Sequence, residues 1–210
     1  MNPYIAYYVF VPLAYLLGSV PFGFLIARAK GIDIRTSGSG NIGATNVLRS
    51  VGKSWGALTL LLDALKGLVP AAVFPLLANH FFQIEAGEVL GLGCGCAAIL
   101  GHNFPVFLKF KGGKGVATTA GVLIGVAPLA LAIGFATFVA VVILSRMVSL
   151  GSIIAALAIP VASWFLYSSN GYLVPSVLTF LGVLVVWRHR ANIARIINGT
   201  ENRINLKGKK

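Results

Sequence analysis

The residues best suited to chemistry lie in the segment TSGSGNIGATNVLRSVGK, residues 36–53, which is rich in glycine, hydroxyl and asparagine side chains and contains no carboxylate. Glycines allow several backbone N–H groups to face one anion. Ser39 and Thr45 can donate hydroxyl hydrogen bonds, and the guanidinium of Arg49 can grip a phosphate with two parallel hydrogen bonds. The segment therefore indicates phosphate binding, and a flexible loop whose cations only set membrane topology is the alternative.

Residues 38–43 of this segment read G-x-G-x-x-G, which also occurs in dinucleotide-binding folds. That site requires a preceding strand, a following helix in a βαβ unit and an acidic residue about 20 positions later. None of these is present in the sequence. We therefore interpret the glycines as phosphate-facing backbone without a dinucleotide fold.

A second segment, GHNFPVFLKFKGGKGVATT at residues 101–119, places Gly112, Gly113 and Lys114 directly before a helix expected from Val116. Backbone donors, a cation and a helix N-terminus together are suited to phosphate. The P-loop pattern fails because Gly115 stands where serine or threonine is required. The segment indicates phosphate binding but not ATP hydrolysis.

The third segment, WRHRANIARI, carries His189, Asn192 and Arg195 at intervals of three residues. On a helix continuing from the last apolar run, these side chains share roughly one face. A histidine contacting lipid headgroups is the alternative for His189.

In the fourth segment, SRMVSLGS, Ser149 and Ser152 lie three residues apart where a helix is expected to begin. Helix capping is the alternative for Ser149, because serine is a favoured N-cap residue.

Asp63 and Lys66 also lie three residues apart, but inside an apolar run. An ion pair at that depth forms at least a structural contact. Ionisable residues inside a membrane are also candidates for a functional site by default. Asp63 is a weak candidate for a base, since Lys66 would hold it ionised.

These segments are embedded in a very apolar chain of 210 residues, with 57% hydrophobic and 10% charged residues and a mean hydropathy of +0.88. Soluble domains have about 45–50% apolar and about 25% charged residues. The composition predicts an all-α integral membrane protein with no separate soluble domain. The net charge of +12 lies in short connectors, where cations set topology, so we expect no nucleic-acid partner.

The apolar windows predict seven transmembrane helices: Tyr4 to Ala27, Trp55 to Ala78, Glu88 to Leu108, Val116 to Ala127, Leu129 to Leu144, Leu150 to Leu166 and Leu173 to Trp187. The fourth and fifth could instead form one long kinked helix, which would make six. The alternation of basic and non-basic connectors needs a turn at Pro128 and favours seven.

The same charges orient the chain, since Arg28 and Lys30 follow the first span. They predict an N-terminus outside and a cytoplasmic C-terminus. The N-terminal apolar run lacks a basic stretch before it and a clear cleavage site, so we expect a retained helix. The four polar connectors, residues 28–54, 109–115, 145–149 and 188–210, then share the cytoplasmic side of a single membrane domain spanning residues 1–210 and are expected to form one site.

Taken together, GSGNIGATNVLR, GHNFPVFLKFKGGKGVATT and RHRANIARIINGTEN, with GSVPFG and LLDALKG at matching places, resemble the PlsY family of bacterial acyl-phosphate:glycerol-3-phosphate acyltransferases. The resemblance implies a bacterial inner-membrane enzyme that transfers a fatty acyl group from acyl phosphate to the 1-hydroxyl of glycerol 3-phosphate. The products would be lysophosphatidic acid and inorganic phosphate. This would be the first step of phospholipid synthesis.

The resemblance also implies roles for individual residues. Catalytic positions carry over onto Ser39, Arg49, Lys114, His189 and Asn192. Substrate-binding candidates are Asn41, Thr45, Asn46, Gly112, Gly113, Ser149 and Ser152.

We expect no cofactor and no metal, because the cytoplasmic connectors hold few carboxylates, and we expect a monomer in membrane lipid. A transporter for a phosphate-bearing anion is the competing class. It is disfavoured because the spans offer only Asp63 and Lys66 as charged groups, and no pair of broken helices marks an inverted repeat. A phosphatidyltransferase would need a carboxylate-rich metal motif, which is missing.

Overall fold

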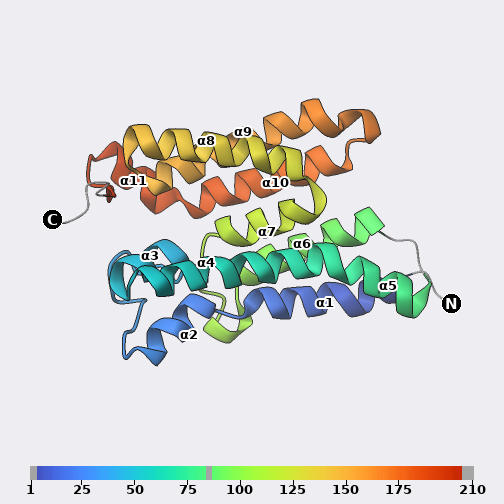
Figure 1. Cartoon of the computed structure of the whole chain (residues 1–210), viewed down its shortest axis with the longest axis horizontal. Helices are drawn as coiled ribbons and strands as arrows, with labels where there is room; N and C mark the ends of the chain where they lie inside the picture. Colours follow the sequence, from blue (N-terminus) through green and yellow to red (C-terminus); the bar gives the residue numbers. More distant parts are fainter. Residues whose placement is uncertain (1–3, 84–86, 205–210) are drawn as a thin grey trace. The chain divides into compact units, whose positions relative to one another are not determined.

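The computed structural model describes residues 4–83 and 87–204, and the regular structure in these residues is helical (Figure 1). Residues 84–86, between the second and third predicted spans, and residues 205–210, at the end of the predicted cytoplasmic tail, lie outside this description. In chain order the elements are α1 (Ile5–Ser19), α2 (Phe22–Ala29), α3 (Ala44–Ser50), α4 (Lys53–Leu68), the π-helical turn η1 (Val69–Val73), α5 (Phe74–Phe82), α6 (Gly87–Asn103), the 3₁₀ turn η2 (Val106–Leu108), α7 (Val116–Val126), α8 (Pro128–Ser145), α9 (Val148–Tyr167), the 3₁₀ turn η3 (Ser168–Asn170), α10 (Leu173–Arg188) and α11 (Arg190–Ile197).

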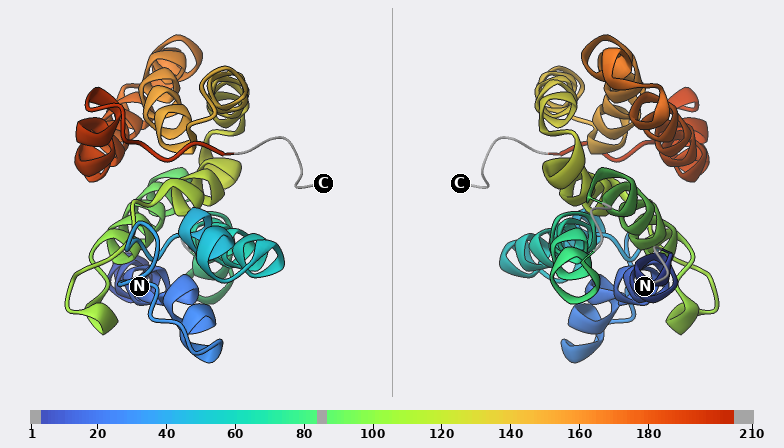
Figure 2. Two further views of the ribbon diagram at one scale, coloured as in Figure 1. Left: turned by 90° about the vertical axis from the view of Figure 1, so that its left-hand side faces the viewer. Right: turned by 90° about the vertical axis from the view of Figure 1, so that its right-hand side faces the viewer.

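Two compact units divide the chain, Met1–Val126 and Ala127–Lys210. The first contains the elements from α1 to α7, and the second those from α8 to α11. Within each unit most helices run side by side, as the views along the long axis show (Figure 2).

Among the described residues, five helical stretches are long and apolar enough to cross a membrane: Ile5–Ala29, Lys53–Phe82, Gly87–Leu108, Pro128–Ser145 and Val148–Asn170. The pair α10 and α11, bent by 56°, passes the same test only if it is counted together. Each of the seven predicted apolar windows therefore coincides with helix, but the structure does not establish seven spans.

A helix break lies at the predicted position, since α7 ends at Val126 and α8 begins at Pro128. Proline lacks an N–H and is accepted in the first turn of a helix, where that group would have no partner. At 11 residues, α7 is about 16 Å long, well short of the ~30 Å hydrocarbon layer.

In the first unit, α1 and α6 approach closely because two glycines face the other helix. A Cβ atom on Gly18 would collide with the carbonyl oxygen of Ala98, and one on Gly101 with the carbonyl oxygen of Tyr15. Small residues at such crossings let membrane helices gain van der Waals contact along their backbones. The hydroxyl of Tyr15 then donates a hydrogen bond of 2.8 Å to the carbonyl of Phe104, just beyond the end of α6.

The helices α4 and α7 are held in register in the same way. A Cβ atom on Gly67 would meet the carbonyl oxygen of Thr118, and one on Gly121 would meet that of Ala64. Because α7 begins at Val116, this packing fixes the point at which the preceding glycine segment enters the helix.

In the second unit, glycines likewise allow close packing of helices against α9. A Cβ atom on Gly182 of α10 would approach the carbonyl oxygen of Ala156 at 2.5 Å, and one on Gly134 of α8 would collide with the side chain of Ile159. Both α8 and α10 therefore pack directly on α9, which places the N-terminus of α9 and the start of α11 in one compact unit.

Candidate functional site

The segment from residue 36 to residue 50 is folded around the carboxamide of Asn46, which is only 2% exposed. Its Nδ2 atom lies within hydrogen-bonding distance of the carbonyl oxygens of Ile34 (3.2 Å), Ser37 (2.9 Å) and Asn41 (2.8 Å). Its Oδ1 atom accepts a hydrogen bond of 2.9 Å from the backbone N–H of Ser39. One buried side chain thus determines the path of the loop.

Ser39 sits between two glycines that have left-handed backbone conformations, Gly38 with φ 58° and Gly40 with φ 68°. Non-glycine residues rarely adopt such angles. A Cβ atom on Gly38 would also collide with Oδ1 of Asn46. The glycines therefore serve the turn itself, and they leave the side chain of Ser39 exposed.

The remaining predicted residues of this segment fall on or beside α3. Arg49 is exposed in the last turn of α3, and Thr45 is half-buried in its first turn. Asn41 accepts a hydrogen bond of 2.9 Å from the N–H of Gly43, directly before the helix. The carboxamides of Asn41 and Asn46, both predicted to bind substrate, are thus engaged with the loop, whereas Ser39 and Arg49 are exposed.

Nearby, Arg35 and Asp33 form an exposed bidentate ion pair, with Nε to Oδ1 at 2.9 Å and Nη2 to Oδ2 at 2.7 Å. Hydrogen bonds from the side chain and the backbone of Arg35 lower the pKa of Asp33 to about 2. The carboxylate of Asp33 is therefore engaged with Arg35 rather than with the cation of α3.

The second phosphate-suited segment, residues 112–115, folds back onto the end of α6. The N–H of Gly113 donates a hydrogen bond of 3.1 Å to the carbonyl of His102. A Cβ atom on Gly113 would collide with the imidazole ring of His102, and one on Gly112 with the carbonyl oxygen of that histidine. Glycine is required at both positions because the chain passes so close, and the half-buried Lys114 follows directly.

Both segments belong to the first compact unit, and a shared apolar cluster connects them. Ile34, Ile42 and Val47 are buried together, and Leu108 of η2 packs against them. The structure thus brings the Ser39 loop and the stretch leading to Lys114 onto one cluster.

The predicted residues of the last two segments lie in the second unit. The structure corrects the expectation that α10 continues straight through His189, because the axis bends by 56° there. The imidazole is 2% exposed, and its Nδ1 atom lies 2.8 Å from the carbonyl oxygen of Val185. That contact requires a proton on Nδ1, so the lone pair of the neutral ring is on Nε2.

Glu201 is the residue that sequence reasoning missed in this unit. Its Oε1 atom accepts hydrogen bonds of 2.8 Å from Ser149 Oγ and Asn192 Nδ2, and its Oε2 atom accepts one of 2.8 Å from Arg195 Nε. Burial favours the neutral acid, but the hydrogen bonds from Asn192, Ser149 and Arg195 outweigh it and hold the pKa of Glu201 below its ordinary value. The shared face expected for Asn192 and Arg195 is confirmed, since both meet the same carboxylate.

The capping alternative for Ser149 is wrong. The N-cap residue of α9 is Met147, and it makes no side-chain capping bond. The hydroxyl of Ser149 binds Glu201 instead. Ser152, also buried, donates a hydrogen bond of 3.0 Å to the carbonyl of Val148 within α9.

Within the residues that the structure describes, no group of three or more histidine, cysteine, aspartate or glutamate side chains is placed to hold a metal ion. The predicted site residues instead carry hydroxyls, amides, cations and the imidazole of His189, with the carboxylate of Glu201 beside them in the second unit. Such groups can bind phosphate oxygens and move a proton.

Comparison with known proteins identifies the family. Residues 8–199 match the family model described as Glycerol-3-phosphate acyltransferase. The chain is 50% identical over 189 residues to the glycerol-3-phosphate acyltransferase of Geotalea daltonii, covering 90% of this chain and 93% of that protein. It is 46% identical over 198 residues to the enzyme of Allorhizobium ampelinum, covering 93% and 91%.

A solved structure is similar over almost the whole chain. The crystal structure of PlsY, an integral membrane glycerol 3-phosphate acyltransferase, in its glycerol 3-phosphate form has a TM-score of 0.83 at 40% identity, covering 95% of this chain and 96% of that one. Its lysophosphatidic acid form has a TM-score of 0.80. Together with the five long apolar helical stretches, this match makes the chain a multi-pass membrane protein. It belongs to the glycerol-3-phosphate acyltransferase family of the integral membrane PlsY type.

Proposed function

We propose that the protein transfers a fatty acyl group from acyl phosphate to the 1-hydroxyl of glycerol 3-phosphate, giving lysophosphatidic acid and inorganic phosphate. The observation that carries this proposal is that two phosphate-suited segments, residues 36–50 and 112–115, lie in one unit of a membrane protein, where Leu108, shortly before the second segment, packs against Ile42 and Val47 of the first. The relative of known structure was solved in a glycerol 3-phosphate form and a lysophosphatidic acid form, which supports the same substrate and product here.

Phosphate recognition would fall to the first unit. Arg49 and Ser39 would hold the phosphate of glycerol 3-phosphate, because both side chains are exposed, Ser39 in the loop before α3 and Arg49 in the last turn of that helix. Lys114 and the amides of Gly112 and Gly113 would hold the phosphate of the acyl donor. Each charge-assisted hydrogen bond contributes about 1.5–3 kcal/mol, and placing cations where negative charge develops lowers the barrier.

The transfer itself would be direct. The 1-hydroxyl oxygen attacks the acyl carbonyl carbon, the bond from that carbon to the phosphate oxygen breaks, and inorganic phosphate departs. Acyl phosphate is an activated anhydride, so alignment of the two substrates supplies much of the rate. No acyl-enzyme is needed, since Cys94 is buried in an apolar cluster and neither it nor Cys96 lies in a polar segment.

The hydroxyl proton has two acceptors in this scheme, His189 and the phosphate of the substrate. Hydrogen bonding of Nδ1 to the carbonyl of Val185 supports His189, because it leaves Nε2 as the basic atom. Asn192, held by Glu201, would orient a substrate oxygen. Thr45, Ser149 and Ser152 are further proposed contacts.

We infer seven transmembrane helices, an N-terminus outside and a cytoplasmic C-terminus in a bacterial inner membrane. In this topology the connectors 28–54, 109–115, 145–149 and 188–210 share the cytoplasmic side and supply one site within a single functional domain. The acyl chain would lie between helices and enter from the leaflet. Cysteines introduced singly into these connectors should react with an impermeant thiol reagent only after inner-membrane vesicles are turned inside out.

Purified protein in detergent, given palmitoyl phosphate and glycerol 3-phosphate, should release phosphate and form lysophosphatidic acid without any gradient. A protein that accepts only an acyl thioester would contradict the proposed donor. A protein that transfers no acyl group in detergent, but moves glycerol 3-phosphate across vesicles, would be a transporter.

Two variants test the assigned roles. Arg49→Ala should raise KM for glycerol 3-phosphate or lower turnover; if both stay at wild-type values, the phosphate assignment is wrong. His189→Ala should lower turnover at saturating substrate. Nearly full turnover would instead assign the proton to the phosphate of the substrate.

A further inference from the structure

The end of α8 carries a pocket that is lined by none of the residues assigned to the reaction. It has a volume of about 430 Å³ and is lined by Leu144, Ser145, Arg146, Arg203 and Ile204. Pockets of roughly 300–1,000 Å³ are typical of small-molecule sites. All five residues belong to the second unit, and the last two lie beyond residue 199, where the match to the family model ends.

The backbone at the end of α8 fixes the position of Arg146. This residue has a left-handed conformation with φ 60°, which non-glycine residues adopt only where neighbouring contacts hold them. The hydroxyl of Ser145 supplies such contacts, since it donates a hydrogen bond of 2.7 Å to the carbonyl of Val141 and accepts one of 3.1 Å from the N–H of Met147. The guanidinium of Arg146 therefore leaves the chain from a well-defined turn.

The C-terminal tail brings a second guanidinium to the same place. The N–H of Ile204 donates a hydrogen bond of 2.8 Å to the carbonyl of Arg146. Two residues before Arg203, Glu201 attaches the tail to α9 and α11 through its hydrogen bonds to Ser149 and Asn192. Arg203 lies between these two attachments, and it is thereby held at the pocket together with Arg146.

The two arginines have no acidic partner in the part of the chain that the structure describes. Both are exposed, and the carboxylates that form ion pairs there are paired with other cations. Glu201, the acid nearest to Arg203 along the chain, uses one oxygen for Ser149 and the other for Arg195. Two like charges at one pocket repel each other, so the pocket is suited to an anion that neutralises both.

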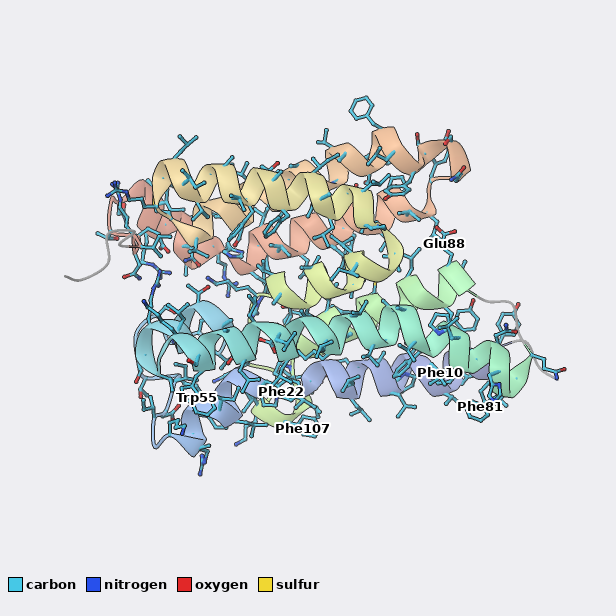
Figure 3. The ribbon with its side chains drawn as sticks, viewed as in Figure 1. Phe10, Phe22, Trp55, Phe81, Glu88 and Phe107 are labelled. Atoms are coloured by element: carbon cyan, nitrogen blue, oxygen red, sulfur yellow. The ribbon has the colours of Figure 1, made fainter. Side chains whose placement is uncertain are left out.

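The helix that leads to the pocket indicates the source of this anion. Only 11% of the apolar window of α8 is buried, and in its last turn Ile143 is 61% and Leu144 85% exposed. Carbon side chains project along this helix, and nitrogen atoms gather beyond its end (Figure 3). In a membrane, acyl chains surround such a surface and the polar headgroups lie at its ends. A lipid beside α8 would therefore place its phosphate next to the arginines.

We propose that Arg146 and Arg203 form a binding site for the phosphate headgroup of an anionic phospholipid from the leaflet around the end of α8. Guanidinium groups bind phosphate oxygens through two parallel hydrogen bonds, and Leu144 and Ile204 provide apolar contacts for the glycerol and the first acyl carbons. The site needs only a membrane and does not depend on the proposed reaction. A bound lipid would also hold the tail whose Glu201 contacts Asn192.

Native mass spectrometry of the full chain in detergent, titrated with dioleoylphosphatidylglycerol, measures this binding. Arg146→Gln and Arg203→Gln should each weaken the tightest-bound lipid on the order of 5- to 10-fold. Arg190→Gln is the matched control, because Arg190 is an exposed arginine of the same unit and its loss changes the net charge equally. It should bind the lipid like wild type. Arg203→Lys keeps the charge but loses the planar fork, so it should also bind more weakly.

Three results of this titration would overturn the proposal. Equal weakening by Arg203→Gln and Arg190→Gln, or full binding by Arg203→Lys, would indicate a general attraction to positive charge. Equal binding of dioleoylphosphatidylcholine would exclude selection of an anionic lipid. Inorganic phosphate and glycerol 3-phosphate in large excess should leave the lipid bound. Displacement by inorganic phosphate would assign the pocket to the free anion, and displacement by glycerol 3-phosphate alone would place the lipid in the candidate active site.

A second readout uses the unaltered protein, so it does not depend on the folding of a variant. Phosphatidylglycerol with a diazirine in its headgroup, crosslinked to the wild-type chain in membranes, should label peptides that contain residues 143–146 and 203–204. Added phosphatidylglycerol should also slow amide hydrogen exchange at residues 201–204. Labelling confined to other peptides, with unchanged exchange in the tail, would refute the site.

Discussion

Replacing Glu201 tests whether one carboxylate holds the second unit's polar residues in place. Glu201→Ala would leave the hydroxyl of Ser149 and the carboxamide of Asn192 without the acceptor that each uses at 2.8 Å. Glu201→Gln keeps a carbonyl oxygen in that position and removes only the charge. The two variants therefore separate the loss of a hydrogen-bond acceptor from the loss of an ion pair.

The magnitude follows from burial. Ser149 is 8% exposed, and a buried hydroxyl that loses its acceptor costs about 1–3 kcal/mol. The alanine variant should therefore lose about 1–3 kcal/mol more than the glutamine variant. The ion pair with Arg195, whose side chain is 34% exposed, is partly screened by solvent and contributes at most about 1 kcal/mol.

Thermal unfolding in detergent, followed by circular dichroism, measures this difference. For a chain of this size 1 kcal/mol corresponds to about 2–4 °C, so the alanine variant should unfold at least about 2 °C below the glutamine variant. Turnover should also be lower in Glu201→Ala than in Glu201→Gln, because Asn192 loses its hydrogen bond to residue 201 only in the alanine variant. Glu88→Ala is the control, since Glu88 is exposed in the first turn of α6. Equal melting temperatures for Glu201→Ala and Glu201→Gln would refute the reasoning.

Three further predictions follow from the same contacts. The pKa of Glu201 is depressed below its ordinary 4.5, so the stability that it contributes is present above that value and is lost as pH falls through the folded pKa; Glu201→Gln should flatten the melting temperature across this acid range. Asn46→Asp places acceptors against three carbonyl oxygens, so its turnover should be no higher than that of Asn46→Ala, and full activity would contradict the loop-organising role. Gly121→Ala would force a methyl group into the carbonyl of Ala64 and cost about 1–3 kcal/mol. Gly93→Ala, whose nearest neighbour would lie at 3.9 Å, should leave the melting temperature near wild type.

The positions of the helices could be predicted from the sequence, because apolar runs and helix breakers are local signals. The separation of α7 from α8 illustrates this, since it depended on Pro128 and on the alternation of connector charge. The bend at His189 could not be predicted from the sequence. No proline or glycine marks it, and WRHRANIARI continues a helical pattern.

The chemical character of the candidate site was also apparent from residue types. Ser39 and Arg49 are exposed and the glycine turn before Lys114 is tight, and these residues stay proposed phosphate ligands. The partners of these residues were not apparent. Asn46 was predicted to contact substrate, yet its carboxamide organises the loop.

By itself, the sequence determined a polytopic helical protein with polar, carboxylate-poor connectors and a family resemblance carried by those connectors. Only the tertiary structure decided which side chains hold the connectors in shape. Ser149 and Glu201 are 52 residues apart, and Lys66 and Val20 are 46 apart. Hydropathy and helical periodicity act over a few neighbouring residues, whereas these hydrogen bonds exist only once helices distant along the chain have packed together.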